Sequence, residues 1–226
     1  VSGVGNIVSF TAVNNGTSVQ TATITVTPIY NGCTGATQDV VITVNPIPSL
    51  TSTLTPAAIC SGDTFAYTPT SATVGASFAW SRALVAGISE AASSSTGNIS
   101  EVLTNTTTLP INVTYVITST IGLCSNAGQA VVVTVNPSPA LSSSLSPAGI
   151  CSGDTFSYVP ASATVGASFS WSRAAVAGIS EGASAGINNP NEVLTNTTGL
   201  PVNVTYEYTI TANGCSQVQN VVVSVN

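Results

Sequence analysis

The chain has 226 residues, of which only 4% are charged: two arginines, eight acidic residues and no histidine, for a net charge of −6. This balance offers no basic patch to nucleic acid or to an anionic membrane surface. Mean hydropathy is +0.44, but the apolar residues alternate with Ser and Thr, and no run approaches the roughly 20 residues of a membrane-spanning helix. Low charge with many β-branched residues favours β structure over disorder.

The sequence contains an internal repeat. Cys60 recurs as Cys151 (151 − 60 = 91), and the same offset relates Trp80 to Trp171 and Cys124 to both Cys215 and Cys33. A long fixed period is typical of small domains arranged in a line. The sequence therefore predicts three units: residues 1–45, the C-terminal half of a repeat (the first unit), and two complete repeats, residues 46–136 (the middle unit) and 137–226 (the last unit).

The first unit carries only the later strands of a domain. We expect its core residues, such as Phe10 and Ile24, to lie uncovered, because half a sandwich leaves a sheet edge and an apolar face without a partner. About 45 preceding residues, of the same longer chain or of a neighbour in a fibre, would complete it. Each later unit begins at a Val-Asn-Pro joint that continues as Pro-x-Pro, with prolines at 46, 48, 137 and 139. Such joints favour a stiff, extended linker and hence a semi-rigid rod.

Strand signals follow each other along a complete unit. Apolar and polar residues alternate over residues 63–69, 76–81 and 111–118, and residues 130–135 end the middle unit as a strand. Glycines and asparagines mark the turns between them. About seven short strands in roughly 90 residues predict an all-β, two-sheet sandwich.

The two complete copies indicate which side chains face the core. Residues 57–90 and 148–181 are identical at 28 of 34 positions, and the differences at 66, 68 and 70 fall on every second residue of one predicted strand. Because side chains alternate faces along a strand, those positions should face solvent. The aromatic residues of opposite parity should form the core: Phe65, Tyr67, Phe78, Trp80 and Tyr115, with their counterparts Phe156, Tyr158, Phe169, Trp171 and Tyr206.

The five cysteines divide among the units. We expect one disulfide within each complete unit, Cys60–Cys124 and Cys151–Cys215, and an unpaired Cys33, whose partner would precede residue 1. Disulfides imply an oxidising compartment. Buried free thiols are the alternative, whereas metal binding is disfavoured because the chain has no CxxC pair and no histidine.

Candidate catalytic groups are scarce. Without histidine or lysine, the usual general bases and Schiff-base nucleophiles are missing, and the serines have no triad partner. The sequence therefore predicts that the chain is not an enzyme. The single arginine of each complete unit is expected in a structural ion pair, Arg82 with Glu90 or Glu101 and Arg173 with Glu181 or Glu192. A ligand-binding arginine is the alternative.

Other ligand classes receive weaker support. Asp63, Glu90 and Glu101 are an alternative set of calcium ligands, although no D-x-D-x-D run occurs; otherwise no cofactor is expected. Sugar binding needs exposed aromatic side chains, and only Tyr30 is expected to be exposed. Glycans are a candidate modification at the Asn-x-Ser/Thr sequons and at the Asp-Thr pairs of Asp63 and Asp154; the sequons are Asn15, Asn98, Asn105, Asn112, Asn196 and Asn203.

The motifs of the complete units resemble a known family. They are Ile-Cys-Ser-Gly-Asp-Thr-Phe, Phe-x-Trp-Ser-Arg-Ala-x-Val-Ala-Gly-Ile-Ser, Glu-Val-Leu-Thr-Asn-Thr-Thr and Gly-x-Cys. This combination resembles the PKD-like repeats of giant surface proteins of Bacteroidota. The resemblance implies tandem Ig-like β-sandwich domains in long secreted adhesins or surface filaments, and no catalytic residues. The Trp-Asp-Phe-Gly-Asp-Gly signature of classical PKD domains is absent, since Trp80-Ser81-Arg82 stands in its place.

The resulting hypothesis is a non-enzymatic, extracellular array that forms a stalk or filament on a bacterial cell surface. Its partners would be adjacent repeats of the same long chain or neighbouring filament subunits. One alternative is a carbohydrate-binding adhesive module. Another is a self-assembling fibre subunit that is completed by strands from a neighbour.

Overall fold

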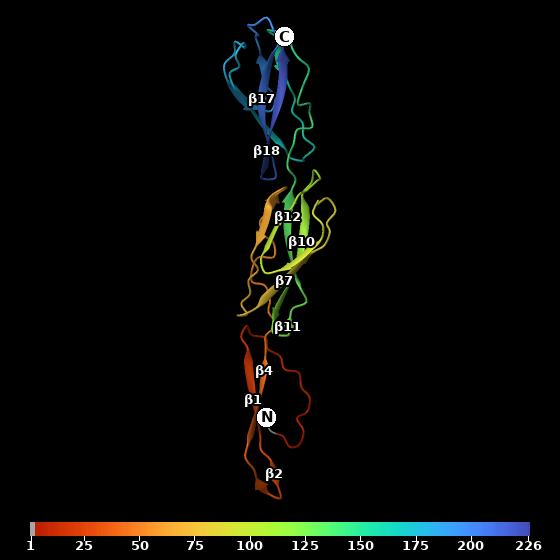
Figure 1. The fold of residues 1–226 in the computed structure, drawn as a ribbon, viewed down its shortest axis with the longest axis vertical. Helices are drawn as coiled ribbons and strands as arrows, with labels where there is room; N and C mark the ends of the chain where they lie inside the picture. Colours follow the sequence, from red (N-terminus) through yellow and green to blue (C-terminus); the bar gives the residue numbers. More distant parts are fainter. Residues whose placement is uncertain (1–2) are drawn as a thin grey trace.

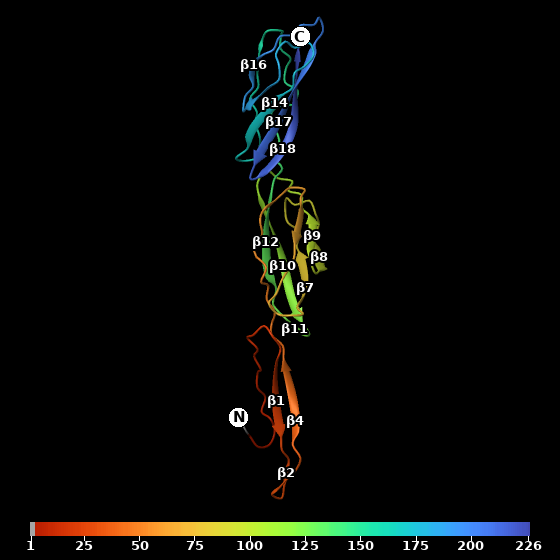
Figure 2. The same cartoon turned by 90° about the vertical axis from the view of Figure 1, so that its left-hand side faces the viewer.

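The computed structural model describes residues 3–226, so residues 1–2 of the expected first unit lie outside the described part of the chain. No helix occurs in residues 3–226, and about 47% of the chain lies in strands, which confirms the all-β prediction. The three units follow one another along a single long axis (Figure 1), and the view turned by 90° shows the same end-to-end arrangement (Figure 2). Residues 3–226 include no helix long and apolar enough to cross a membrane.

The first unit is an open hairpin. β1 (Gln20–Val26) pairs antiparallel with β4 (Gln38–Val44), and β2 (Ile29–Tyr30) pairs with β3 (Cys33–Thr34) at the far tip. None of its residues from 3 to 45 is buried, and Phe10 is 60% exposed. This segment therefore has no core of its own.

The middle unit contains two sheets. The larger has the order β5-β12-β10-β7-β8, with β11 also pairing with β10, and the smaller pairs β6 with β9. The strands are β5 (Ile59–Cys60), β6 (Thr64–Tyr67), β7 (Ser77–Arg82), β8 (Ser93–Thr96), β9 (Ile99–Val102), β10 (Ile111–Ile121), β11 (Cys124–Ser125) and β12 (Gln129–Asn136). Four of them fall on the predicted strands, because strict alternation of apolar and polar residues suits a sheet with one buried face.

The last unit repeats this plan with the order β15-β14-β17-β18 and the smaller sheet β13-β16. Its strands are β13 (Thr155–Ser157), β14 (Ser168–Arg173), β15 (Ser184–Ile187), β16 (Asn191–Val193), β17 (Val202–Ala212) and β18 (Cys215–Val225). The long β17–β18 hairpin runs nearly the whole length of the unit, with its turn toward the middle unit (Figure 1).

Each complete unit has a separate aromatic core between its two sheets. In the middle unit Phe65, Tyr67, Trp80 and Tyr115 are buried, and Phe78 is half-buried at the margin. The last unit buries the equivalent Phe156, Tyr158, Trp171 and Tyr206, with Phe169 at the margin. The indole of Trp80 lies edge-on to Tyr115, with ring centroids 5.7 Å apart. The two arginines are also buried, each 2% exposed.

Candidate functional site

The joint between the middle and last units carries a covalent cross-link. A disulfide joins Cys60 to Cys215, with the two Cα atoms 5.7 Å apart. Cys60 lies in β5, directly beside Asn136 at the end of β12. Cys215 follows the turn of the β17–β18 hairpin, at the end of the last unit that faces the middle unit (Figure 1). The bond therefore connects two successive units.

This pairing shows that the expected bonds Cys60–Cys124 and Cys151–Cys215 are wrong. Within the middle unit, Cys60 lies beside the start of β10 and Cys124 beyond its end. The 11 residues of β10 separate the two cysteines by about 33 Å at the rise of an extended strand. A disulfide requires Cα atoms within about 7 Å, so the strand direction forbids the bond. The last unit separates Cys151 from Cys215 in the same way across β17.

Other contacts at this joint support the disulfide. The Asn136 side-chain amide donates a hydrogen bond to the Asn213 carbonyl at 2.8 Å. Asn213 and Gly214 form the hairpin turn with φ of 52° and 78°, the left-handed pair that an Asn-Gly turn provides at low cost. The linker prolines Pro137 and Pro139 are buried. The turn, the linker and the disulfide thus fix the two units to each other at three places.

The remaining cysteines, Cys33, Cys124 and Cys151, are free. Cys33 and Cys151 are exposed, and Cys124 is half-buried. Cys124 lines an open hollow of about 640 Å³ between the first and middle units. Its other walls are residues 11–16, residues 42–45 and Ile47; this space is called the joint hollow below.

A buried ion pair occupies the rim of each core. Arg82 Nε donates to Glu101 Oε2 at 2.9 Å, and the side chains are 1% and 17% exposed. Glu101 also accepts hydrogen bonds from the hydroxyls of Tyr115 and Ser93. The Arg82 Nη atoms donate to the backbone carbonyls of Glu90 and Ala91. The last unit reproduces the pair with Arg173 and Glu192 at 2.9 Å.

The expectation that the carboxylate of Glu90 or Glu181 pairs with the arginine is wrong. The Glu90 carboxylate accepts from the Thr104 amide at 2.8 Å and from the Ser89 hydroxyl, and Glu181 does the same with Thr195 and Ser180. Glu90 lies in the loop after β7 and Thr104 in the loop after β9, and the Ser89 amide also donates to the Thr104 carbonyl, so the two loops run side by side and the Thr104 amide reaches the Glu90 carboxylate. The pair therefore ties β7 to β9, and the second glutamate fixes the adjoining loop.

These contacts lower the pKa values of the carboxyls. Burial raises the pKa of Glu101, but hydrogen bonds from Arg82, Ser93 and Tyr115 outweigh it and hold that pKa below 4.5. For Glu90, burial likewise opposes the Thr104 and Ser89 hydrogen bonds, which lower the pKa to about 2. Burial and the hydrogen bond to Glu101 raise the pKa of Tyr115. All these groups keep one protonation state through the neutral range.

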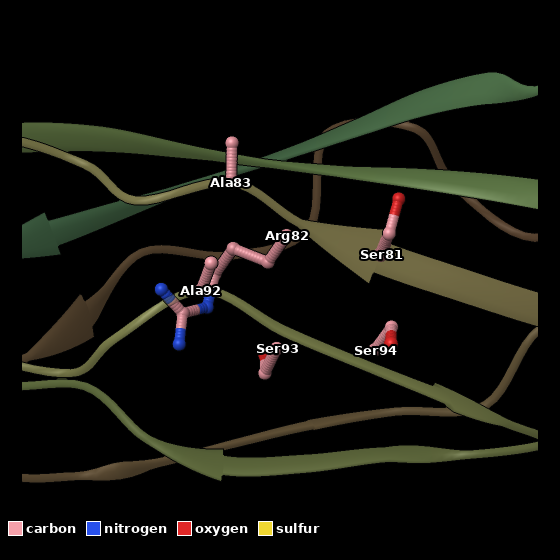
Figure 3. A pocket seen from close by; sticks show the side chains of 6 residues that line it. All are labelled: Ser81, Arg82, Ala83, Ala92, Ser93 and Ser94. Atoms are coloured by element: carbon pink, nitrogen blue, oxygen red, sulfur yellow. The ribbon is translucent and has the colours of Figure 1, made fainter.

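The surface beside Arg82 is a shallow depression of about 430 Å³, shown in Figure 3. Its lining residues are Ser81, Arg82, Ala83, Ala92, Ser93 and Ser94. The guanidinium is buried, and its nitrogens already donate to Glu101, Glu90 and Ala91. Few accessible hydrogen-bond donors therefore remain for a ligand. This favours the structural reading of Arg82 over a binding role.

The acidic residues considered for calcium do not converge. Asp63 accepts from the Cys60 amide, while Glu90 and Glu101 have the separate partners described above. Within residues 3–226 no three His, Cys, Asp or Glu side chains are grouped as a metal site would need.

Sequence reasoning considered Asn105 and Asn196 as glycosylation sequons and missed their structural role. Asn105 is 6% exposed, and its side-chain amide donates to the backbone carbonyls of Leu109 and Val135 at 2.8 and 2.9 Å. Asn14 and Asn196, one repeat away, make the same bond to the end of the neighbouring strand, at Val44 and Val225. Their recurrence at an offset of 91 was the available signal, and burial of the Asn105 amide leaves that sequon no room for a glycan.

Comparison with known proteins gives a family and a low-identity set of structures. A model of the PKD-like domain matches residues 57–139 and 148–226. Similar solved structures include two immunoglobulin domains of DIP-gamma, at 12% identity and a TM-score of 0.36, covering 80% of this chain and 98% of that one. Another is Drosophila N-cadherin EC1-3, at 11% identity and a TM-score of 0.29, covering 84% and 72%.

An endo-fucoidan hydrolase of glycoside hydrolase family 107 is similar at 9% identity and a TM-score of 0.32, where 91% of this chain covers 34% of that one. No curated protein matches the sequence. The family match spans more than half of the chain and falls on the two units that carry the aromatic cores and buried arginines. The chain therefore belongs to the PKD-like domain family.

Proposed function

We propose that this chain is a non-enzymatic, extracellular spacer of the adhesion type, which forms part of the stalk or filament of a bacterial surface adhesin. The single observation that carries the proposal is the Cys60–Cys215 disulfide, because it connects two units that the linker already joins. A cross-link at a joint adds nothing to a catalytic site. It restricts bending and keeps the units in line under load.

The chemistry of the joint also supports an extracellular location. Disulfides persist in oxidising compartments and are rare in the cytoplasm. The low charge and the lack of histidine and lysine leave few groups for acid–base or nucleophilic catalysis. Partners would be further units of the same kind, at the bacterial surface or in a secreted filament.

The competing function, carbohydrate binding, is supported by two exposed aromatic side chains, and both lie in the first unit. Tyr30 is 80% exposed at the tip of the first unit and Phe10 is 60% exposed, whereas the aromatic residues of the complete units lie in the two cores. A sugar platform needs accessible ring faces, and because Phe10 is expected to be a core residue of the completed unit, Tyr30 alone provides a small one.

Small-angle X-ray scattering tests the spacer. A strand of 11 residues such as β17 spans about 35 Å, so three units in line give a rod of roughly 110 Å or more. We expect a rod with a narrow distribution of lengths in the oxidised chain and a broader one for Cys60→Ser. The proposal fails if both proteins show the same broad distribution. Glycan-array binding that is lost in Tyr30→Ala would favour the carbohydrate-binding module instead.

A further inference from the structure

We propose that Cys151 and Cys124 are the two ends of further inter-unit disulfides, so that every joint of such an array is cross-linked as the observed joint is. Cys151 would bond the hairpin cysteine of a PKD-like unit joined in line beyond the last unit. Cys124 would bond the β5-type cysteine of a complete unit joined in line before the middle unit. This inference rests on the proposed spacer function and names the partner and the bond at each end.

The loop that carries Cys151 already has the conformation of the loop that carries the bonded Cys60. The Cys60 amide donates to the Asp63 carboxylate at 3.3 Å, and the Cys151 amide donates to Asp154 at 3.2 Å. The next residue anchors each loop to the end of its unit: Ser61 N to Asn136 O at 2.8 Å, and Ser152 N to Asn226 O at 2.9 Å. Cys151 is therefore held where Cys60 is held, on the far end face of its unit, and its thiol is exposed.

Cys124 has the position of the bonded Cys215. It pairs with Ile121 across a two-residue turn, as Cys215 pairs with Ala212. The turn also approaches the preceding joint as its counterpart does: a Cβ on Gly122 would lie 3.3 Å from the Asn45 side-chain amide, and Asn213, one repeat later, accepts from Asn136. Both hairpins thus contact the asparagine of the joint before them.

The joint hollow beside Cys124 shows where its partner would lie. Its walls include Asn14, Val44 and Asn45, the repeat equivalents of Asn105, Val135 and Asn136. In the middle unit those three residues surround the Cys60 loop. Val135 and Asn136 pair with Ile59 and Cys60, and the Asn136 carbonyl accepts from the Ser61 amide. The backbone amide of Asn105 donates to the Ser61 hydroxyl. Asn14 keeps its bond to the Val44 carbonyl at 2.8 Å, so the walls of the site are formed and the cysteine loop is the element that would fill it.

An intra-unit bond cannot use these thiols, since the long strands β10 and β17 hold the two cysteines of each unit at opposite ends. Each new bond forms from two thiols, which lose two protons and two electrons. The acceptor is a disulfide oxidant, such as a dithiol oxidoreductase in its disulfide form or oxidised glutathione, which becomes two thiols. The covalent joint supplies a high effective concentration of the partner thiol.

The test extends the chain by one unit. A second copy of residues 137–226 is fused directly after Asn226, which recreates the Val-Asn-Pro joint, and the protein is oxidised with glutathione. Denaturation, alkylation and cleavage after the arginines, at Arg82 and Arg173 and at the arginine of the added copy, give four fragments. We expect two linked pairs, the first with the third through Cys60–Cys215 and the second with the fourth through Cys151 and the added hairpin cysteine.

The matched control is Cys151→Ser in the extended chain, which should lose the second link and keep the first. An alkylated Cys151 together with an alkylated hairpin cysteine in the added unit, when that unit shows a buried tryptophan by fluorescence, would overturn the proposal. The unextended chain should stay monomeric under the same oxidation. Dimers linked through Cys151 there, with no link in the extended chain, would mean that the partner is another copy.

The other end is tested by fusing a copy of residues 46–91 before Val1, which completes the first unit at the repeat offset. Cys124 should then bond the added β5-type cysteine, and a free Cys124 in a folded chain would limit the inference to Cys151. The disulfide maps do not depend on the shape of the chain, so the two proposals can fail separately. A cross-linked chain that bends freely in scattering would refute the spacer function and support the further disulfides. A straight chain with free thiols at Cys124 and Cys151 would support the spacer function and refute the further disulfides.

Discussion

Replacing Glu101 by glutamine should destabilise the middle unit by about 3 kcal/mol and leave the last unit unchanged. The Arg82 side chain is 1% exposed, and Glu101 is the carboxylate that pairs with it. Removing one partner of a buried ion pair leaves an uncompensated charge, at a cost of roughly 3–5 kcal/mol. The glutamine oxygen can still accept a hydrogen bond from Arg82 Nε, which places the expected loss at the lower end of that range.

The two tryptophans make the measurement specific to one unit. Trp80 and Trp171 lie one in each core and are each 7% exposed, so the fluorescence of each should shift to the red when its own unit unfolds. In a Trp171→Phe background the signal reports the middle unit alone. With a guanidinium slope of about 2–3 kcal/mol per molar for a domain of this size, the midpoint should fall by about 1 M.

Two further variants define what would refute this reasoning. Glu192→Gln in a Trp80→Phe background should shift the last unit by a similar amount, because the same pair occurs there. Replacing both Arg82 and Glu101 by leucine should recover much of the loss, since apolar packing can substitute for a buried pair. An unchanged midpoint for Glu101→Gln, or an equal shift in both units, would show that the pair does not hold the rim of the core.

Further predictions concern the disulfide, the core and the acidic residues. Non-reducing cleavage after the two arginines should link fragments 1–82 and 174–226 and release 83–173 unlinked; release of 1–82 unlinked would contradict the joint bond. Trp80→Ala should lower the stability of the middle unit by about 3–5 kcal/mol, measured by calorimetry, and an unchanged transition would place the indole outside the core. Acidification from about pH 5 to pH 2 should destabilise both complete units, because four glutamates have pKa values below 4.5. Their stabilising effect is present above the unfolded-state pKa and is lost as the pH falls through the folded values, about 2 for Glu90. Circular dichroism across that range checks it, and a flat profile from pH 5 to 2 would contradict the assigned hydrogen bonds.

The sequence alone determined the features that depend on local periodicity. Alternation along residues 111–118 predicts β10 and its inward Tyr115, because side chains of an extended strand must alternate faces. The differences between the two copies at 66 and 68 mark the outer face of β6, where burial also alternates. The repeat offset locates the aromatic cores and the buried arginines of both units for the same reason: identical sequences form the same local structure.

The tertiary structure decided which residues meet across a distance. A count of one cysteine pair per unit suggested a bond inside each unit, and strand direction places those cysteines at opposite ends of β10 and β17. Only the stacking of one unit on the next brings Cys60 to Cys215. Likewise, the sequence contains two glutamates that could pair with Arg82. The pairing of β6 with β9 places Glu101 beside the arginine, whereas the Glu90 carboxylate binds the Thr104 backbone amide. Periodicity specifies the face on which a side chain lies, whereas contacts between distant residues depend on the order, the direction and the end-to-end packing of the strands.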